Sequence, residues 1–579
     1  MRRFAALYQA LDATTSTAAK VEALVAYFQQ AELADAAWAV YFLSGGKARR
    51  TVSMSTLKAL ACEAAGLDEW LFEECYQVVG DLAETIAHVV PGSGSDLDRG
   101  LASWVQDYVW PLRDLEVCEQ RVQIRQAWQA LDPQGRFLYV KLMGGGFRVG
   151  VSKVLVQRAL AQVAGIEVHT VAQRMMGWTQ SHHLPSAQRY RQLIASTQPP
   201  GVSSGDAGGD QACAHGEGGQ PYPFFLAHAW QGDLNRLGSV EAWQVEWKYD
   251  GIRAQVVRRG GQTWIWSRGE ELVTERFPEV VTACTGMPDG AVMDGELLAW
   301  KAGQALPEPF QRLQQRISRK SLTRKVLQDV PVVFMAYDLL EWQGVDLRAQ
   351  PQKQRRSVLE QVIQPLGLPI SPLVQAHDWT AMALYRQQAR ERGVEGLMLK
   401  HRDSAYGTGR RQVALSDGQG AGWWKWKVDP YTVDAVLIYA QAGHGRRASL
   451  YTDYTFAVWN RPPLDAQEAE GVIRAIERRE PAQPGALQLV PIAKAYSGLS
   501  QGEIDRVDRE IRKHTLEKFG PVRSVKPTMV FELGFEGLNL SPRHKSGIAV
   551  RFPRILRIRD DKPLHQADHL QSVKALVNA

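Results

Sequence analysis

One lysine of this chain lies in a setting that suits nucleophilic chemistry. Lys248 stands in Glu246-Trp247-Lys248-Tyr249-Asp250-Gly251-Ile252-Arg253, where apolar residues that exclude water accompany charged residues that can orient it. Burial and nearby positive charge lower the pKa of a lysine and free its lone pair, which can attack the α-phosphorus of a nucleotide. For a lone Lys-x-Asp-Gly, a strand with an exposed lysine and a turn is the better explanation, so the residues downstream decide.

Five polar clusters follow Lys248, most of them at the expected ends of strands: Ser267–Glu270, Asp294–Leu297, Tyr337-Asp338, Glu395–Lys400 and Trp423–Lys427. Strand alternation places Lys425 and Lys427 on one face, where two ammonium groups can hold a phosphate, and the tryptophans on the other. Two carboxylates at strand ends, Glu296 and Glu395, can bind a ribose hydroxyl and a divalent cation. An aromatic residue at a strand end can stack on a base.

The apolar pattern predicts which elements carry these clusters. From Tyr222 onward short strands alternate with helices, including a hairpin around Gly260-Gly261 and a buried strand over Val330–Tyr337. From about Asp429 strands predominate, which suits a small β-barrel with one helix near Gly502–Lys518. The expected barrel strands are Thr432–Tyr439, Tyr454–Trp459, Thr528–Leu533 and Ala549–Arg551.

The first 195 or so residues are predicted to be helical. Apolar residues recur at spacings of three and four, as in the stripe from Leu71 to Val89. Two glycine-rich turns with basic residues, at 44–50 and 144–150, suit phosphate contact or are plain loops between helices. Residues 198–221 are rich in glycine, serine and proline, which predicts a flexible linker.

Composition sets the outer limits. A chain of 579 residues is too long for one core, and its net charge of +6 is modest. The N-terminus lacks the apolar core of a signal peptide, and we expect no membrane span. The five cysteines form no Cys-x-x-Cys pair, so we expect neither a zinc site nor disulfides, and a cytoplasmic protein with reduced thiols.

The order of these motifs resembles the covalent nucleotidyltransferases, and specifically the ATP-dependent DNA ligases of the long bacterial type. The resemblance runs from about residue 222 to 563 and ends in Arg551–Lys562, which resembles the family's terminal motif. The run from Arg543 to Lys562 holds seven Lys or Arg against two Asp, which favours phosphate contact. The helical N-terminal region resembles the family's DNA-binding domain less specifically.

The resemblance implies a multidomain fold and a set of residue roles. It comprises an all-α DNA-binding domain (1–197), the linker (198–221), an α+β adenylation core (222–428) and a C-terminal OB-fold β-barrel (429–579). Lys248 is the implied nucleophile, Glu246 reads adenine and Tyr337 stacks on it, while Glu395, with Glu296, binds Mg²⁺ or Mn²⁺. Contacts to the rest of the nucleotide are implied for Arg253, Arg268, Glu296, Arg411 (or Arg410), Lys425 and Lys427, and pyrophosphate is oriented by Arg557, Arg559 and Lys562.

By the same resemblance, the chain is a monomeric ATP-dependent DNA ligase. It would seal nicks between a 5′-phosphate and a 3′-hydroxyl in duplex DNA, through lysyl-AMP and DNA-adenylate, in replication, recombination or repair. The resemblance also implies a place at the nucleoid and an association with a helicase and a nuclease. Two departures are Tyr337 where the family usually has Phe, and a long stretch, Gln412–Gly422, before Lys425.

Three alternatives remain at this stage. An RNA ligase or a capping guanylyltransferase shares the core motifs, although capping enzymes generally lack a long helical N-terminal domain. NAD-dependent DNA ligases share Lys-x-Asp-Gly, but their four-cysteine zinc site is absent here. A non-catalytic nick-binding protein could keep the fold, although no expected catalytic position carries an inert residue.

Overall fold

The computed structural model describes residues 1–46, 51–92, 94, 99–144, 149–179, 184–195, 219–319, 322–409, 413–414, 420–443, 450–483 and 485–576. Arg410, Arg411, both basic glycine-rich turns in part, and most of the predicted linker lie outside these ranges. Within them no helix is long and apolar enough to cross a membrane. Nor do three or more of the described His, Cys, Asp and Glu side chains gather where they could hold a metal ion.

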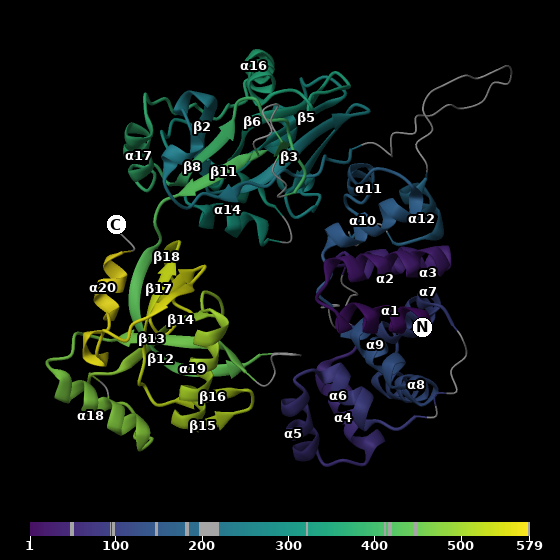
Figure 1. The fold of residues 1–579 in the computed structure, drawn as a ribbon, viewed down its shortest axis with the longest axis vertical. Helices are drawn as coiled ribbons and strands as arrows, with labels where there is room; N and C mark the ends of the chain where they lie inside the picture. The colour runs from purple at the N-terminus through teal and green to yellow at the C-terminus, as the bar shows by residue number, and fades with distance from the viewer. Residues whose placement is uncertain are drawn as a thin grey trace. The chain divides into compact units, whose positions relative to one another are not determined.

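The chain divides into two compact units. Figure 1 labels the helices and strands, coloured from purple at the N-terminus to yellow at the C-terminus. The first comprises Met1–Ala48, Arg99–Val105 and Gly146–Val428, and the second comprises Arg49–Asp98, Gln106–Gly145 and Asp429–Ala579. The N-terminal region is helical, as predicted, and its helices are shared between the two units.

The helices of the first unit pack through small apolar faces. Ser16 caps α2 by accepting a hydrogen bond from the backbone of Ala19, and α10 packs against α2. Lys20 of α2 is buried and donates to the carbonyl oxygens of Val149 and Gly150. These contacts tie α2 to the residues that precede α10. These helices are α1 Arg2–Ala13, α2 Thr17–Gln30, α3 Leu33–Leu43, α7 Leu101–Ser103, α10 Lys153–Ala164, α11 Val168–Arg174 and α12 Ala187–Ile194.

In the second unit, the apolar stripe from Leu71 to Val89 forms two helices, α5 and α6. Gly80 follows α5, and Asp81 then caps α6 by accepting from the backbone of Glu84. Buried Arg136 of α9 donates to the carbonyl oxygen of Ala87, which ties α9 to α6. The helices are α4 Met54–Ala65, α5 Glu69–Val79, α6 Leu82–Val89, α8 Val117–Ala130 and α9 Pro133–Gly144.

Two sheets form the rest of the first unit. The five-stranded sheet has the order β4-β3-β5-β6-β7, and the four-stranded sheet has the order β1-β11-β8-β2. The expected hairpin around Gly260-Gly261 joins β3 to β4. The strands are β1 His228–Ala229, β2 Trp243–Tyr249, β3 Ile252–Arg259, β4 Gln262–Ser267, β5 Ala291–Ala299, β6 Val332–Trp342, β7 Val345–Asp346, β8 Val394–His401 and β11 Trp423–Lys427, beside a separate pair, β9 Val413–Ala414 and β10 Gly420–Ala421.

Apolar clusters hold these two sheets together. One cluster joins Val245 and Leu399 of the four-stranded sheet to Leu298 and Met335 of the five-stranded sheet. A second cluster lies between the five-stranded sheet and helices that include α14 and α16, which contribute Leu313 and Leu359. The helices of this part are α13 Pro278–Ala283, α14 Phe310–Ile317, α15 Arg324–Asp329, α16 Gln352–Ile363 and α17 Trp379–Gln387.

The C-terminal part of the second unit is rich in strands, as predicted. A seven-stranded sheet and a two-stranded sheet contain all four expected strands, while the closed OB-fold barrel stays a prediction. The prediction of a single helix was wrong, because two further helices, α18 and α20, flank α19. The elements are β12 Tyr431–Ala442, β13 Tyr451–Trp459, α18 Ala466–Glu477, β14 Leu489–Ala495, α19 Gln501–His514, β15 Thr515–Phe519, β16 Val522–Val525, β17 Val530–Phe535, β18 Gly537–Leu540, β19 Ile548–Arg551, β20 Arg554–Ile558 and α20 Leu570–Ala575.

The expected helix near Gly502–Lys518 also ends earlier than predicted. α19 stops at His514, and Thr515 adopts extended backbone angles. The next residues form β15, which pairs with β16, so a helical charge pattern gives way to tertiary strand pairing.

Candidate active site

Three charged side chains from neighbouring strands meet: Lys248, Glu395 and Lys427. Glu395 of β8, the central strand of the three, accepts a hydrogen bond from Lys248 of β2, and its Oε2 lies 3.3 Å from Nζ of Lys427 on β11. Burial opposes the charge of Glu395, but the two lysines outweigh it and hold the pKa of this carboxyl below its ordinary value. A carboxylate thus lies between two ammonium groups.

Gly396, which follows Glu395, lies very close to the backbone of β11. Gly396 has a φ of +136° and lies opposite Lys427 in the strand register. A Cβ at this position would stand 2.4 Å from the carbonyl oxygen of Trp426. The backbone therefore needs glycine at the position directly after Glu395.

Gly251 has a related role on the other side of Lys248. A Cβ on Gly251 would lie 2.4 Å from the carbonyl oxygen of Leu297 and 2.8 Å from Cγ of Glu296. The Lys-x-Asp-Gly turn therefore lies directly on β5, and no larger residue fits between them. This close approach brings Lys248 near the polar residues of the five-stranded sheet.

Glu296 is held in a partly buried position on β5. Burial raises the pKa of Glu296 to about 8, and the nearby carboxyls of Glu395 and Asp294 act in the same direction. Lys248 and Arg253 oppose this shift. Near neutral pH, Glu296 therefore has an accessible protonated form, in contrast to Glu395.

The prediction that the clusters lie at strand ends was wrong for Asp294–Leu297 and Tyr337-Asp338, whereas Ser267 does end β4 and Glu395 lies at the start of β8. β5 continues beyond Glu296 to Ala299, and β6 continues beyond Tyr337 to Trp342. Charged residues within a strand can be accommodated where a neighbouring strand supplies their partners, as Arg253 of β3 does for Asp294 of β5. The sequence alone could not show these cross-strand partners.

Glu246 and Lys400 form a buried ion pair behind the nucleophile. Their side chains are 2% and 1% exposed, and Nζ of Lys400 lies 2.9 Å from Oε1 of Glu246. Gln244 donates to the same oxygen at 2.5 Å. Burial lowers the pKa of Lys400, while Glu246 opposes that shift. Lys400 and Gln244 thus hold Oε1 of Glu246, the residue expected to read adenine.

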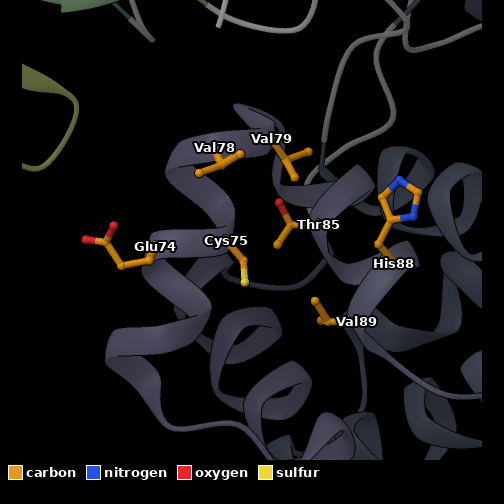
Figure 2. A pocket seen from close by; sticks show the side chains of 7 residues that line it. All are labelled: Glu74, Cys75, Val78, Val79, Thr85, His88 and Val89. Atoms are coloured by element: carbon orange, nitrogen blue, oxygen red, sulfur yellow. The ribbon is translucent and has the colours of Figure 1, made fainter. Parts of the chain in front are cut away.

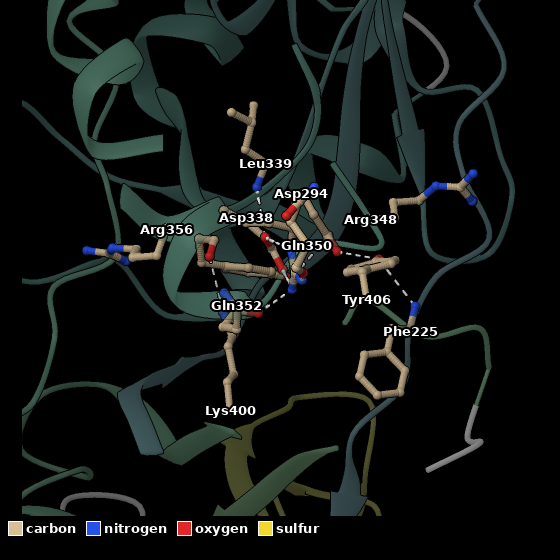
Figure 3. A network of polar contacts seen from close by, with 12 residues as sticks. Phe225, Asp294, Asp338, Leu339, Arg348, Gln350, Gln352, Arg356, Lys400 and Tyr406 are labelled. Carbon is tan, nitrogen blue, oxygen red and sulfur yellow. Dashed lines mark hydrogen bonds and ion pairs between the residues drawn. The ribbon is translucent and has the colours of Figure 1, made fainter. Parts of the chain in front are cut away.

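Arg253 is already engaged by protein groups. Its Nη2 and Nε lie 2.7 and 3.2 Å from the two oxygens of Asp294, and Nη1 donates to the carbonyl of Phe225. Tyr406 donates to Asp294 at 2.6 Å and accepts from the backbone N–H of Phe225 (Figure 3). Burial opposes the charge of Arg253, but Asp294 outweighs it and raises its pKa well above the ordinary value.

Tyr337 lies in an aromatic and cationic surround. Its ring meets Trp423 edge-on at 6.3 Å between centroids, and Nζ of Lys400 lies 4.3 Å from the Tyr337 centroid. The prediction that all the tryptophans of β11 face away from its lysines was wrong for Trp423. Trp424 and Trp426 pack in a different cluster, because alternation groups odd-numbered Trp423 with the lysines at 425 and 427.

A fully buried ion pair supports the backbone beside Tyr337. Arg355 of α16 contacts both oxygens of Asp338 at 2.9 Å, and both side chains are fully buried. Gln352 also accepts from Arg355, at 2.5 Å, and lies beside Asp338 in Figure 3. This network anchors α16 to β6 and fixes the strand that carries Tyr337.

The remaining predicted nucleotide contacts are less defined. Arg268 is exposed, and its backbone N–H donates to the carbonyl oxygen of Arg253. Lys425 is partly buried on β11. Arg410 and Arg411 lie outside the described residues, so the choice between them stays a prediction.

The predicted pyrophosphate-orienting residues belong to the second unit. Asp434 of β12 lies 2.6 Å from Nζ of Lys562 and 2.9 Å from Nη1 of Arg559. Arg557 pairs with Glu532 at 2.5 Å. Asp434 itself is held through its backbone N–H, which donates to Asp568 at 2.8 Å. Asp434 therefore gathers two of the three cations of the terminal motif.

A pocket in the helical part of the second unit carries none of these residues. Figure 2 shows it between α5 and α6, with a volume of about 380 Å³. Its lining is mostly apolar and comprises Glu74, Cys75, Val78, Val79, Thr85, His88 and Val89. We assign the chemistry to the cluster around Lys248 instead, because there the candidate nucleophile meets Glu395, which also pairs with a second lysine, Lys427.

Sequence reasoning assigned no role to several residues that the structure places at the site. They are Asp294, Asp338, Arg355, Lys400 and Tyr406. Asp434, beside the terminal motif of the second unit, was likewise given no role. Lys400 and Asp294 lay inside quoted motifs, and charge within an otherwise apolar strand was a usable signal for both. Arg355 and Tyr406 gave no such signal, because their partners are distant in sequence.

Comparisons with known proteins agree on one family. A family model described as "ATP dependent DNA ligase domain" matches residues 226–427, and another described as "DNA ligase N terminus" matches residues 1–161. The "Probable DNA ligase" of Koribacter versatilis is 30% identical over 100% of this chain and 96% of its own. The "DNA ligase" of Natronomonas pharaonis is 31% identical over 84% of this chain and 80% of its own.

A solved structure extends the likeness to the fold. The protein named Pmar-Lig_Pre covers 96% of this chain and 99% of its own, with a TM-score of 0.57 and 14% identity. At that identity the match concerns architecture alone.

Proposed function

Because the chain belongs to the ATP-dependent DNA ligase family, we propose that its covalent nucleophile is Lys248. The protein is an ATP-dependent DNA ligase, so its reaction requires a group that can carry AMP. The meeting of Lys248, Glu395 and Lys427 carries this assignment, because it joins a nucleophile to groups that can hold a phosphate.

The proposed reaction seals a nick in three displacements at phosphorus. Nζ of Lys248 attacks the α-phosphorus of ATP, a P–N bond forms, the bond to pyrophosphate breaks, and the amine loses a proton. An oxygen of the 5′-phosphate at the nick then displaces Lys248 and takes the AMP. Finally the 3′-hydroxyl oxygen attacks that 5′-phosphorus, loses its proton, and AMP leaves.

The charged side chains around Lys248 have distinct proposed roles. Lys427 and Lys425 neutralise the oxygens of the α-phosphate, which otherwise repel a nucleophile. Glu246 reads the base and Tyr337 stacks on it. The ribose and the nick 5′-phosphate are assigned to Arg253, Arg268 and Glu296, with Arg411 as a further phosphate contact.

The two carboxylates suit Mg²⁺ in a limited way. Mg²⁺ commonly takes one or two protein carboxylates and completes its shell with water and substrate phosphates. Glu395 favours its charged form and stands beside Lys427, the proposed phosphate contact, which fits this arrangement. Glu296, whose pKa is raised to about 8, would serve as the second donor once it is ionised. When bound, the metal ion would neutralise charge on the phosphates.

The DNA contacts follow from the family and from charge. We assign the helical region, residues 1–197, to duplex binding, and the terminal motif to orienting pyrophosphate through Arg557, Arg559 and Lys562. A monomeric state, a place at the nucleoid, use of Mn²⁺ and association with a helicase and a nuclease stay predictions.

The test uses the full chain and labelled nucleotides. Incubation with Mg²⁺ and α-labelled ATP should give an acid-labile protein–AMP adduct on the peptide that contains Lys248. GTP and NAD⁺ should give little, and a nicked duplex added afterwards should remove the label and become sealed. An adduct on another lysine, or an equal adduct with GTP, would contradict the proposal.

A further inference from the structure

Lys400 has no role in the proposed mechanism, yet it contacts two residues that are assigned to the base. Its side chain is 1% exposed and lies on β8. The proposed mechanism uses Lys400 neither as the nucleophile nor as a phosphate contact. Its Nζ lies 2.9 Å from Oε1 of Glu246, 3.2 Å from the carbonyl oxygen of Tyr337 and 4.3 Å from the centroid of the Tyr337 ring. It therefore touches both residues assigned to the base.

The contacts of Glu246 are one-sided. Lys400 and Gln244 donate to Oε1, and Nη1 of Arg356 lies 3.8 Å from that same oxygen. Within the described part of the chain, no hydrogen bond or ion pair of Glu246 ends on Oε2. Oε1 is thus held by two donors, whereas no donor of the described residues is hydrogen-bonded to Oε2.

This asymmetry suits a particular donor. The exocyclic amine of adenine donates hydrogen bonds, whereas the corresponding oxygen of guanine or hypoxanthine accepts them. An acceptor held in place against that position attracts the amine and repels the oxygen. A site built to bond one such group rejects an analogue that lacks it much more strongly than an apolar pocket does.

We propose that Lys400 is the positioning residue that sets the enzyme's choice of purine, by fixing Oε1 of Glu246 so that Oε2 faces the exocyclic group. The inference rests on the proposed role of Glu246. Without the ammonium, Gln244 is the remaining close donor to the carboxylate, which can then rotate and present either oxygen. Lys400 acts through Glu246 and takes no part in the chemistry at phosphorus.

The test compares ATP with inosine triphosphate, which differs at the exocyclic position. In full-length Lys400→Met, we expect the ratio of kcat/KM for adduct formation with ATP to that with inosine triphosphate to fall by about tenfold or more. The loss should lie mostly in KM for ATP. A merely structural role would lower both nucleotides alike, so an unchanged ratio in a folded variant overturns the proposal.

Two further variants separate the outcomes. Lys353→Met, on the exposed face of α16 at a surface ion pair with Asp403, should leave the ratio unchanged. Glu246→Gln should lower the ratio by itself, and adding Lys400→Met should lower it no further. The double variant also removes both buried charges together, so it serves if Lys400→Met does not fold.

An additional loss in the double variant would show that Lys400 acts apart from Glu246 and would overturn the inference. Wild-type enzyme keeps this test separate from the proposed function. If wild type forms no adduct on Lys248, the proposed function fails. If it does and the ratio is insensitive to Lys400, only this inference fails.

Discussion

The charged cluster around Lys248 and that of the terminal motif are built differently. Around Lys248, the supporting pairs are sealed in the core, with Glu246–Lys400 and Asp338–Arg355 at most 2% exposed. In the terminal motif, Arg559 and Lys562 are 17% and 22% exposed and share one carboxylate, Asp434. Arg557 is 58% exposed.

The difference separates a fixed template from cations that remain available. Buried, fully partnered groups resist rearrangement, because breaking one pair leaves an uncompensated charge in a poorly solvated place. Partly exposed pairs exchange more cheaply for other partners, since water screens the loss. We therefore expect the geometry around the base to be preset. The partly exposed contacts, which are those between Lys248 and Glu395 (21% and 17% exposed) and those of the terminal motif, should be exchangeable between steps.

The largest expected effect comes from the nucleophile. Arginine keeps the positive charge of Lys248 but stays protonated and is a poor nucleophile. Lys248→Arg should therefore fold and form no protein–AMP adduct, as measured by mass spectrometry after ATP and Mg²⁺. It should still seal a pre-adenylated nick slowly, because Lys248 attacks nothing in that step. A protein–AMP adduct that persists in Lys248→Arg would show that Lys248 is not the nucleophile.

The next effect should be specific to one step. Lys562→Ala removes a cation assigned to the leaving pyrophosphate, so self-adenylation should fall by about 100-fold or more. Sealing of a pre-adenylated nick involves no pyrophosphate and should fall far less. Single-turnover rates of the two steps provide the measurement. Equal losses in both steps would mean that Lys562 is structural or acts throughout.

A smaller effect is expected at Asp434, which pairs with Arg559 and Lys562 of the terminal motif. Asp434→Asn keeps an acceptor but loses the charge that holds Arg559 and Lys562. Because those pairs are partly exposed, we expect self-adenylation to slow by about fivefold, which corresponds to about 1 kcal/mol. Glu532→Gln, at exposed Arg557, is the matched control and should have less effect. An Asp434→Asn rate equal to wild type would show that Asp434 orients nothing.

The sequence predicted the template's members better than their support. Lys248, Glu395 and Lys427 were found because each stands in a short local motif, and strand pairing brings those motifs together. Asp338–Arg355 joins residues whose pairing depends on how α16 packs against β6, which no local pattern encodes. Other features also override periodicity. Gly80 ends α5 and Asp81 caps α6, which breaks the apolar stripe, and the pairing of β15 with β16 ends α19 early.

The smallest expected effect concerns Glu296 and the dependence of stability on pH. Its carboxyl has an ordinary pKa of 4.5 and a folded pKa of about 8. Between these values the folded chain keeps a proton that the unfolded chain has released. Ionisation therefore favours the unfolded state, and the free energy of unfolding falls as the pH rises through this window.

Glu296→Gln cannot titrate and should lack this loss. We expect the Tm of the variant, relative to that of wild type, to rise by about 2–4 °C between pH 5 and pH 8 and to level off above pH 9. Calorimetry without nucleotide, in the presence of a chelator, measures the difference. Parallel Tm curves would place Glu296 in a solvated setting, and the template around Lys248 would then be less sealed than its neighbours indicate.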